Sequence, residues 1–365
     1  MRVLVVNAGS SSVKLSLLGD DDETLAEREL PAPHATLDER ELRDALGQGL
    51  ARADAVGHRI VHGGERFREA VPIDAEVEAA LRELVELAPL HQPKSIAALD
   101  AVSAVLPGVP AVGCFDTAFH AALPEAAATY ALPAVLRERW RLRRFGFHGL
   151  SHAWVARRAP ALLRAQLPGL RIVSCHLGAG ASLCAIANGR SVDTTMGFTP
   201  LEGLVMATRS GSVDPGLLLW LLERSAVSER ELAHALEHDS GILGLTGTAD
   251  MREVLTRSAA GDEVAELGRE VYLHRLRAAI GAMSAALGGV DALVFTGGVG
   301  ENSAEIRARA TRSLGFLGLA IDDRHNTEVA DQDAEISADG CRAHTLVIHA
   351  REDLEIARQV REVLR

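Results

Sequence analysis

Residues 5–14 read VVNAGSSSVK, and this stretch decides how the chain around it folds. An apolar run ends at Asn7, six small or polar residues cover 7–12, and a second apolar run begins at Val13. A plain hairpin needs little more than Asn-Gly or Asp-Gly at its turn. The longer turn of small residues therefore predicts a backbone that a ligand approaches closely.

The same layout returns in the second half of the chain. Residues 174–182 read SCHLGAGAS, so an apolar run leads into His176 and a turn of small residues, and a further apolar run follows at 183–187. Strand, polar residue, small turn and strand thus occur twice. This repetition suggests an internal duplication.

Short apolar runs alternate with helical patterns along the whole chain, which is typical of an α/β protein. The expected strands cover residues 3–6, 13–18, 24–30, 55–61, 109–115, 171–175, 183–187, 291–295 and 345–349. The expected helices cover residues 37–50, 75–87, 214–223, 228–237, 250–255 and 262–287, and a final helix ends at 365.

Composition and charge narrow the class of protein. A net charge of −12 over 365 residues argues against a broad surface for nucleic acid or for an anionic membrane, so we expect neither partner. The four cysteines form no C-x-x-C pair, and the apolar run at 3–6 is too short for the core of a signal peptide. The most apolar long stretch, 278–300, is interrupted by Gly288, Gly289 and Asp291. It therefore predicts the end of a helix followed by a buried strand rather than a membrane span. We therefore expect a cytoplasmic protein.

Three glycine-rich stretches predict a nucleotide site: the turns at 7–12 and 176–182, and FTGGVGEN at 295–302. Small residues let backbone N–H groups point at phosphate oxygens, and a flat base can lie against glycine backbone. Neither G-x4-G-K-[ST] nor a full G-x-G-x-x-G occurs in these stretches, which disfavours a P-loop or Rossmann site. Either turn alone could also be a simple hairpin.

Two arginines lie beside glycine-rich stretches. Arg59 lies in GHRIVHGGE, residues 57–65, on the same face of the expected strand as Val61, and Arg209 lies in MATRSGSVDPG, residues 206–216. A guanidinium matches the oxygens of a phosphoryl group in transfer and keeps its charge there. The alternative for each is a surface ion pair.

An aspartate and two histidines are further candidates. Asp116 ends the expected strand in CFDTAFH, residues 114–120, where it could hold Mg²⁺, orient a substrate oxygen or cap the next helix. His148 and His152 lie four residues apart in FGFHGLSH, residues 145–152. A zinc pair would need a third ligand that is not evident, so we favour one histidine that donates a hydrogen bond to a substrate anion.

Two other classes of protein remain open on these residues. HGGE at 62–65 and GLSHA at 149–153 resemble parts of an α/β-hydrolase, with His344 or His349 as the base, but the nucleophile elbow lacks its second glycine. A nucleotide-binding scaffold without catalysis would use the glycine turns and leave the arginines without a role.

As an ordered set, the stretches resemble the acetate kinase family of acetate and propionate kinases over essentially the whole chain. The matching stretches are NAGSSSVK, GHRIVHGGE, APLHQP, FDTAFH, FGFHGLSH, HLGAGAS, TPLEGLVMATRSG, TADMR, FTGGVGENS and REDLEIAR. The family belongs to the superfamily of acetate and sugar kinases, heat-shock chaperones and actin.

The resemblance implies two duplicated actin-like (ribonuclease H-like) domains around a central cleft. The expected N-terminal domain comprises residues 1–118 plus 354–365. The expected C-terminal domain comprises residues 119–353 and carries the nucleotide site and the interface of a homodimer.

The resemblance also implies the roles of individual residues. The catalytic residues would be Arg59, Asp116, His148 and Arg209. The acyl pocket would be formed by Val61, Leu90, Phe147 and Pro200. The nucleotide contacts would come from Lys14, His176, Leu177, Gly178, Ala179, Gly180, Asp250, Met251, Arg252, Gly298, Val299, Gly300 and Asn302. The metal ligands would be Asn7 and Glu352.

The implied reaction is reversible phosphoryl transfer from ATP to the carboxylate of a short-chain fatty acid, which gives an acyl phosphate and ADP. Acetate is the expected acceptor and propionate the alternative, with Mg²⁺ as cofactor, for which Mn²⁺ can substitute. Several positions depart from the family pattern, which puts the phosphoryl-donor preference in question. They are Ala179 and Gln92 in place of Asn, Ser212 in place of Asp, and Ala350-Arg351 in place of Thr-Asn.

Overall fold

A computed structural model describes residues 1–9, 12–31, 39–47, 49–87, 92–165, 169–224 and 227–365. The chain divides into two compact units. The first comprises Met1–Ala121, Phe147–Trp154 and Arg351–Arg365, and the second comprises Ala122–Gly146 and Val155–Ala350. Unlike the domain division expected from the sequence, the first unit includes 147–154 and takes its last segment from Arg351. The boundaries of independently folding domains stay a prediction.

The first unit is built on a six-stranded mixed sheet with the order β3-β2-β1-β4-β6-β5. Its strands are β1 Val3–Ala8, β2 Ser12–Leu18, β3 Thr24–Pro31, β4 Ala55–Ile60, β5 Val71–Pro72 and β6 Ala111–Phe115. β1 and β2 are antiparallel and place Asn7 opposite Lys14, whereas β1, β4 and β6 run parallel. The carboxyl ends of three strands therefore meet at one edge of the sheet.

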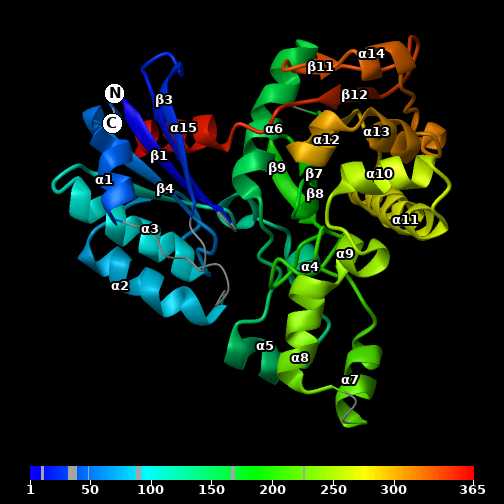
Figure 1. The fold of residues 1–365 in the computed structure, drawn as a ribbon, viewed down its shortest axis with the longest axis horizontal. Coiled ribbons are helices and arrows are strands. Elements are labelled where there is room, and N and C mark those ends of the chain that lie inside the picture. The colour runs from blue at the N-terminus through cyan, green and yellow to red at the C-terminus, as the bar shows by residue number, and fades with distance from the viewer. Residues whose placement is uncertain (10–11, 32–38, 48, 88–91, 166–168, 225–226) are drawn as a thin grey trace. The chain divides into compact units, whose positions relative to one another are not determined.

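Helices cover both faces of this sheet because consecutive side chains of its central strand β1 are apolar and point to opposite faces (Figure 1). Leu4 and Val6 of β1 pack with α1 and α3, and Val3 and Val5 pack with α15. The helices of this unit are α1 Glu39–Gly47, η2 Leu50–Arg52, α2 Ala75–Glu83, η3 Leu84–Leu87, α3 Gln92–Val105, η4 Ala118–His120 and α15 Glu352–Val363.

The sheet of the second unit repeats the first. Its order, β9-β8-β7-β10-β12-β11, places an antiparallel hairpin, three parallel strands and a short antiparallel edge strand in the same sequence. The strands are β7 Arg171–Leu177, β8 Ala181–Ala187, β9 Arg190–Thr194, β10 Ala292–Thr296, β11 Ala334–Glu335 and β12 His344–Val347. The duplication suggested by the two glycine turns is thus present in the topology.

The second unit carries more helices than the first. The long helix α11 contacts β7, β8 and β9, and α12 follows directly from β10. The helices are α4 Glu125–Ala128, α5 Ala134–Trp140, α7 Pro215–Glu223, α8 Glu229–His234, η5 Ala235–Asp239, α9 Gly241–Thr246, α10 Met251–Ala259, α11 Glu263–Ala286, α12 Gly297–Asn302, α13 Ala304–Thr311, η6 Gly315–Leu317 and α14 Asp323–Thr327. One helix, α6 Gly149–Leu163, begins in the first unit and ends in the second.

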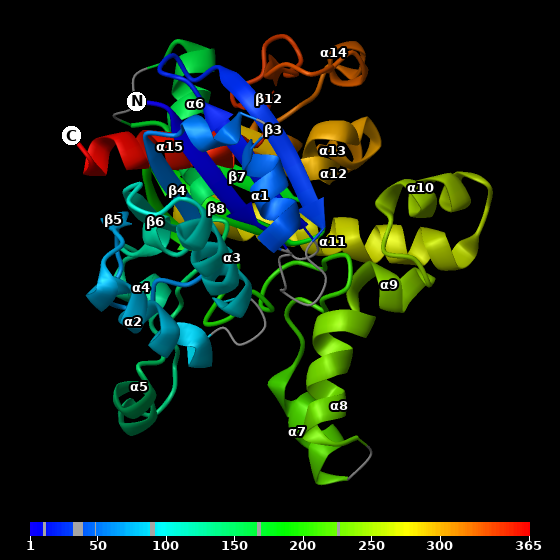
Figure 2. The same ribbon diagram turned by 60° about the vertical axis from the view of Figure 1, so that its left-hand side comes forward.

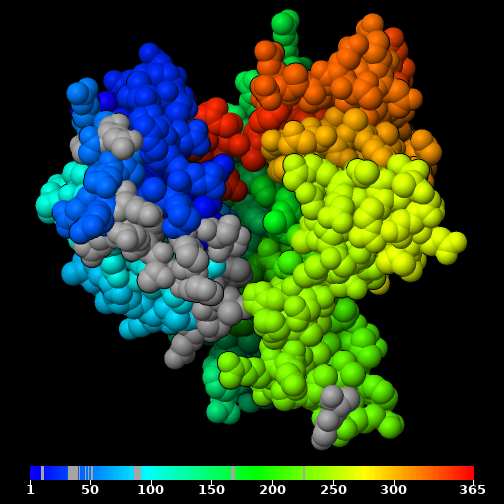
Figure 3. All heavy atoms as spheres, in the orientation of Figure 1, coloured from blue at the N-terminus to red at the C-terminus, as the bar shows by residue number. Residues whose placement is uncertain are grey.

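α7 stands away from the sheet of its own unit in both ribbon views (Figures 1 and 2), and its part of the chain is open to solvent in Figure 3. None of its residues is buried, although its sequence is PGLLLWLLE. Leu219 is 60% exposed and Trp220 is 49% exposed. This helix exposes an apolar surface to solvent.

The strands follow the expectation closely, and the helices less so. The N-cap of α2 at Asp74 is as expected, and its side chain accepts from Val77 N at 2.8 Å. The helix expected at 37–50 spans 39–47, and residues 32–38 lie outside the described part of the chain. No helix was expected at α3 or α6, because α3 is apolar on most sides with Pro93 in its first turn and α6 contains Pro160.

Candidate functional site

The carboxyl ends of β1, β4 and β6 bring together three predicted site residues. β4 and β6 are neighbours in the sheet, so Arg59 of β4 lies beside Asp116, which directly follows β6. Arg59 Nη2 donates to Asp116 Oδ2 at 2.7 Å, and Arg59 Nε lies 3.1 Å from both oxygens of the same carboxylate. On its other side, Arg59 Nη1 donates to Asn7 Oδ1 at 3.0 Å. The guanidinium is therefore fixed on two sides.

Glu352, at the start of α15, completes this cluster. Asn7 Nδ2 donates to Glu352 Oε2 at 2.9 Å, and the same oxygen lies 3.9 Å from Arg59 Nη1. Two carboxylates thus share one guanidinium, and the four side chains together carry excess negative charge. We call Asn7, Arg59, Asp116 and Glu352 the arginine cluster.

The arginine cluster shifts the pKa values of its members. Burial opposes the charge of Arg59, but the charges of Asp116 and Glu352 outweigh it, so the pKa of Arg59 is raised. Burial also raises the pKa of Asp116, against the lowering effect of Arg59, and the charge of Glu352 adds to the rise. Both shifts have one origin, because a single cation compensates two carboxylates, one of which is fully desolvated.

His148 lies directly before α6 in a strained backbone conformation. Its φ of 55° is in the left-handed region, which is uncommon for a residue other than glycine. The next residue, Gly149, donates its N–H to Asp116 O at 2.9 Å, and a Cβ there would lie 2.2 Å from that oxygen. The segment that carries His148 is thereby held against Asp116. Strained residues of this kind concentrate at functional sites.

The predicted acyl-pocket residues lie in different parts of the chain. Val61 follows β4, and Phe147 is buried in the first unit with its ring 5.5 Å from that of His62. Leu90 lies outside the described residues. Gln92, which replaces the usual asparagine, accepts from His62 N at 3.1 Å and donates to His62 O at 3.2 Å. The longer side chain therefore still supports the segment after β4.

The other predicted acyl-pocket residue, Pro200, contacts the predicted catalytic residue Arg209 in the second unit. Arg209 Nη1 donates to Pro200 O at 2.6 Å. Burial lowers the pKa of Arg209, and the charge of Glu237 acts in the opposite direction. Ser212, which stands where aspartate is usual, accepts from Gly203 N at 3.0 Å and donates its own N–H to Gly203 O at 3.0 Å.

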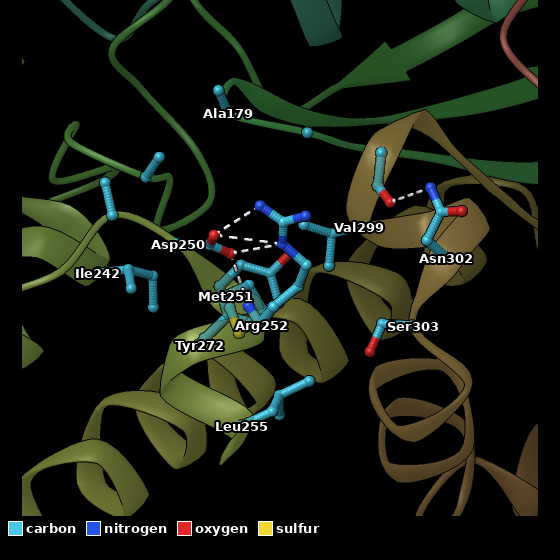
Figure 4. Close-up of a pocket in the computed structure, with 14 residues that line it drawn as sticks. Ala179, Ile242, Asp250, Met251, Arg252, Leu255, Tyr272, Val299, Asn302 and Ser303 are labelled. Atoms are coloured by element: carbon cyan, nitrogen blue, oxygen red, sulfur yellow. Dashed lines mark hydrogen bonds and ion pairs between the residues drawn. The ribbon is translucent and has the colours of Figure 1, made fainter. Parts of the chain in front are cut away.

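A pocket of about 780 Å³ lies in the second unit, beside the turn after β7 and the start of α12 (Figure 4). Eight predicted nucleotide-contact residues line it: Gly178, Ala179, Asp250, Met251, Arg252, Gly298, Val299 and Asn302. Asp250 caps α10 and forms a two-oxygen contact with Arg252, with Nη2 to Oδ2 at 2.7 Å. The hydrogen bond from Arg252 lowers the pKa of Asp250 to about 2.

Sequence reasoning missed six residues of this lining: Ala207, Ile242, Ala249, Leu255, Tyr272 and Ser303. Four of them are aliphatic and Tyr272 is a buried aromatic residue, so little in the sequence separates them from ordinary core residues. Among the other predicted contacts, His176, Leu177, Gly180 and Gly300 lie next to lining residues in sequence. Lys14 is an exposed residue of β2 in the first unit and does not line this pocket.

The glycine stretch at the start of α12 depends on close backbone contact. Gly297 has φ +77°, and a Cβ there would lie 3.0 Å from Leu177 O. Gly297 N donates to Glu301 Oε1 at 2.7 Å, and the buried Arg307 donates to Glu301 O at 2.6 Å and to Gly300 O at 2.9 Å. Burial lowers the pKa of Arg307 to about 10. Glu301 and Arg307 are supporting residues that sequence reasoning did not identify.

The donor set of the arginine cluster suits a hard cation. Mg²⁺ prefers oxygen ligands and is typically bound by one or two carboxylates together with substrate phosphates and waters. The cluster supplies amide and carboxylate oxygens with excess negative charge. Among the described residues, no group of three or more His, Cys, Asp or Glu could hold a metal ion. The cluster thus fits an ion that a nucleotide brings with it better than a resident structural metal.

Comparison with known proteins identifies the family. The sequence pattern of the acetokinase family matches residues 32–358. The chain belongs to the acetokinase family. The chain is 42% identical to the acetate kinase of Thermotoga maritima over 398 aligned residues, which cover 100% of this chain and 99% of the relative.

Solved structures agree with the family assignment. The acetate kinase of Porphyromonas gingivalis matches with a TM-score of 0.91 at 36% identity, over 100% of both chains. A propionate kinase from Francisella tularensis matches with a TM-score of 0.91 at 34% identity, over 99% of both chains. The predicted fold, α/β with two duplicated actin-like domains, and the predicted acetate-kinase-type phosphotransferase activity are both confirmed.

The family assignment decides between the alternatives drawn from the sequence. Membership of a kinase family speaks against both an α/β-hydrolase and a scaffold without catalysis. The described residues supply no third ligand beside His148 and His152, which a zinc pair would need. In the part of the chain that the structure describes, no helix is long and apolar enough to span a membrane.

Proposed function

We propose that this chain transfers the terminal phosphoryl group of ATP reversibly to the carboxylate of a short-chain fatty acid, and that acetate is the preferred acceptor. The observation that carries the proposal is the arginine cluster, in which a buried guanidinium is oriented by a two-oxygen contact with Asp116. A carboxylate acceptor is already ionised at neutral pH and needs no general base. Positioning and charge therefore supply the catalysis.

We assign the transfer step to four residues. Arg59 and Arg209 would bind the oxygens of the phosphoryl group, and Asp116 would hold Arg59 in the correct orientation. His148 would donate a hydrogen bond to the same group. Such preorganised donors stabilise the charge of the transition state without reorganising during the reaction.

We propose that Asn7 and Glu352 hold Mg²⁺ that arrives with ATP. The ion supplies neutralisation of the phosphate charge when it is bound. Ala350 and Arg351 replace neighbours that are usual in the family, and Arg351 forms a two-nitrogen contact with Asp353, with Nη2 to Oδ2 at 2.8 Å. Because the Arg351 guanidinium is bound to Asp353, it does not compete with Arg59 for the carboxylate of Glu352.

The pocket of the second unit is our proposed nucleotide site. Asp250, Met251 and Arg252 would contact the ribose and base on one side, and Gly298, Val299, Gly300 and Asn302 on the other. His176, Leu177, Gly178 and Gly180 would contact the phosphates, with Ala179 offering no side-chain donor. Lys14 stays a predicted contact.

Acceptor choice would rest on the predicted acyl pocket of Val61, Leu90, Phe147 and Pro200. One methylene in a hydrophobic pocket is worth about 1–3 kcal/mol, so a preference for propionate is a real second candidate. The match to a structure described as a propionate kinase supports propionate as the second candidate acceptor. A comparison of kcat/KM for acetate and propionate separates the two.

We further propose a cytoplasmic homodimer that forms through the second unit. The exposed apolar surface of α7, with Leu217, Leu219, Trp220 and Leu222, supports this. Light scattering of the wild type and of a Leu219→Lys variant would test it, because a charge at a buried dimer interface should shift the protein toward the monomer.

The decisive test of function is trapping of acyl phosphate as the hydroxamate, with ATP, Mg²⁺ and acids of two to four carbons. Arg209→Ala should lower turnover by about 10²–10³-fold while ADP binding stays within error. Arg312→Ala, at an exposed arginine of the same unit, is the matched control. Turnover near the wild-type value in Arg209→Ala would refute the role of Arg209. Ester cleavage without ATP, and no hydroxamate, would refute the kinase itself.

A further inference from the structure

A network of three side chains fixes the segment that carries Pro200, and none of the three was a predicted site residue. Glu202 lies at its centre. Arg144 Nη2 donates to Glu202 Oε1 at 2.8 Å, and the Tyr130 hydroxyl donates to Glu202 Oε2 at 2.7 Å. Both carboxylate oxygens are therefore engaged by residues from a distant part of the sequence.

The same residues hold the backbone on either side. Arg144 Nη1 donates to Thr195 O at 3.2 Å and to Met196 O at 3.0 Å, and Phe198 N donates to the Tyr130 hydroxyl at 2.8 Å. Burial and the contact with Glu202 raise the pKa of Tyr130, so its hydroxyl stays protonated as a donor. The segment 195–202 is thus anchored at both ends, and Pro200 lies within it.

One contact joins this segment directly to the loop of Arg209, and two more tie that loop together just after the segment. The Arg209 guanidinium donates to Pro200 O, Ser212 exchanges two hydrogen bonds with Gly203, and Met206 N donates to Arg209 O at 3.1 Å. Gly203 has φ +112° and Gly211 has φ +70°, so both loops need glycine where they meet. A shift of Pro200 would therefore be passed on to Arg209.

We propose that Glu202 is a positioning residue for phosphoryl transfer, which acts through Pro200 on the Arg209 guanidinium with Arg144 and Tyr130 as its partners. This inference rests on the proposed role of Arg209. A catalytic group misplaced by about 1 Å can cost about 10²-fold in rate. Loss of the Glu202 charge should therefore lower turnover although Glu202 touches no substrate.

The test is a double-mutant cycle of Glu202→Gln with Arg209→Lys, assayed as hydroxamate formation. Glu202→Gln should lower kcat by about 10-fold or more in the wild-type background and by less than about 2-fold beside Arg209→Lys, with the KM for ATP unchanged. Tyr130→Phe should reproduce the fall in kcat. It replaces Glu202→Gln in the test if that variant does not fold.

Asp291→Asn is the matched control for a merely structural effect. Asp291 forms a two-oxygen contact with Arg171 in the same unit and is 33% exposed, against 35% for Glu202. It should lower the unfolding temperature without changing kcat of the folded enzyme. The proposal is overturned if Glu202→Gln loses the same factor in both backgrounds, or loses no more than Asp291→Asn.

Hydrogen exchange separates this proposal from the proposed function. In Glu202→Gln, exchange should rise at the amides of Gly203, Met206 and Ser212 as well as at Phe198, whatever the acceptor acid is. A rise confined to 195–202 would overturn the coupling even in an active kinase. A wild type that exchanges as expected but forms no acyl phosphate would overturn the proposed function alone.

Discussion

The imidazole of His58 gives the sharpest prediction about stability. His58 lies on β4 between Val6 of β1 and Gly113 of β6, and it is 1% exposed. Its neighbours on the same face of the strand, Val56 and Ile60, belong to apolar clusters. Neither ring nitrogen has a hydrogen-bond partner among the residues that the structure describes. A neutral imidazole is tolerated there, but a protonated one is not.

The magnitude follows from the shift in pKa. Burial lowers the pKa of His58 from 6.5 to about 4. Between pH 6.5 and pH 4, His58 binds a proton more readily in the unfolded chain than in the folded protein. The folded protein is therefore fully stable with respect to His58 above pH 6.5 and loses unfolding free energy as the pH falls. At pH 5 this linkage removes about 2 kcal/mol from the unfolding free energy, against almost nothing at pH 7.

His58→Leu should remove this loss, because leucine has a similar volume and leaves no buried nitrogen unpaired. Protection of the β1 and β4 amides against hydrogen exchange, measured at pH 7 and pH 5, reports the local unfolding free energy. On going from pH 7 to pH 5, the local unfolding free energy of the variant should rise relative to that of the wild type by about 2 kcal/mol. His274→Leu, at an exposed position of α11, is the control. An equal difference at both pH values would refute a neutral, unpaired His58.

Two further variants test the site itself. Asp116→Asn weakens the contact that orients Arg59, so turnover should fall by about 10²-fold or more. The affinity for ADP, measured by calorimetry, should stay the same. Unchanged turnover would contradict the orienting role of Asp116. Gly297→Ala places a Cβ about 3.0 Å from Leu177 O at a residue with positive φ, so it should cost about 1–2 kcal/mol of unfolding free energy. An unfolding temperature equal to that of the wild type within error would contradict the close approach.

The sequence predicted the strands well because half-buried and buried strands leave short apolar runs bounded by small residues. Both glycine turns and the stretch at 295–302 were found for this reason. Asp250 and Arg252, which line the pocket of the second unit, were predicted only through the resemblance to the family. The helix α3 was missed because it is apolar on most sides and gives no clear period. The apolar lining, such as Leu255 and Tyr272, carries no signal that separates it from the core.

The pairing within the arginine cluster could not be read from the sequence. Arg59 and Asp116 were each placed at a strand end, but their contact depends on β4 and β6 being neighbours, although β5, α2 and α3 lie between them in the chain. The support of Pro200 was equally hidden. Tyr130 and Arg144 reach Glu202 from loops far away in sequence, and a contact between loops leaves no periodic pattern.

The duplicated sheets show how one topology came to carry two kinds of site. In the first unit, the polar residue before the glycine turn, Asn7, is engaged by Arg59 and Glu352, so the strand ends gather charge. In the second unit, the turn after His176 faces a pocket lined mainly by apolar and glycine residues. The two sheets share one topology, but the pocket of the second unit is also lined by residues of α9, α10 and α11. A charged cluster suits phosphoryl and metal binding, whereas an apolar pocket suits a base. The different surroundings of the two turns therefore come from side chains and helices added around a repeated sheet rather than from two different sheets.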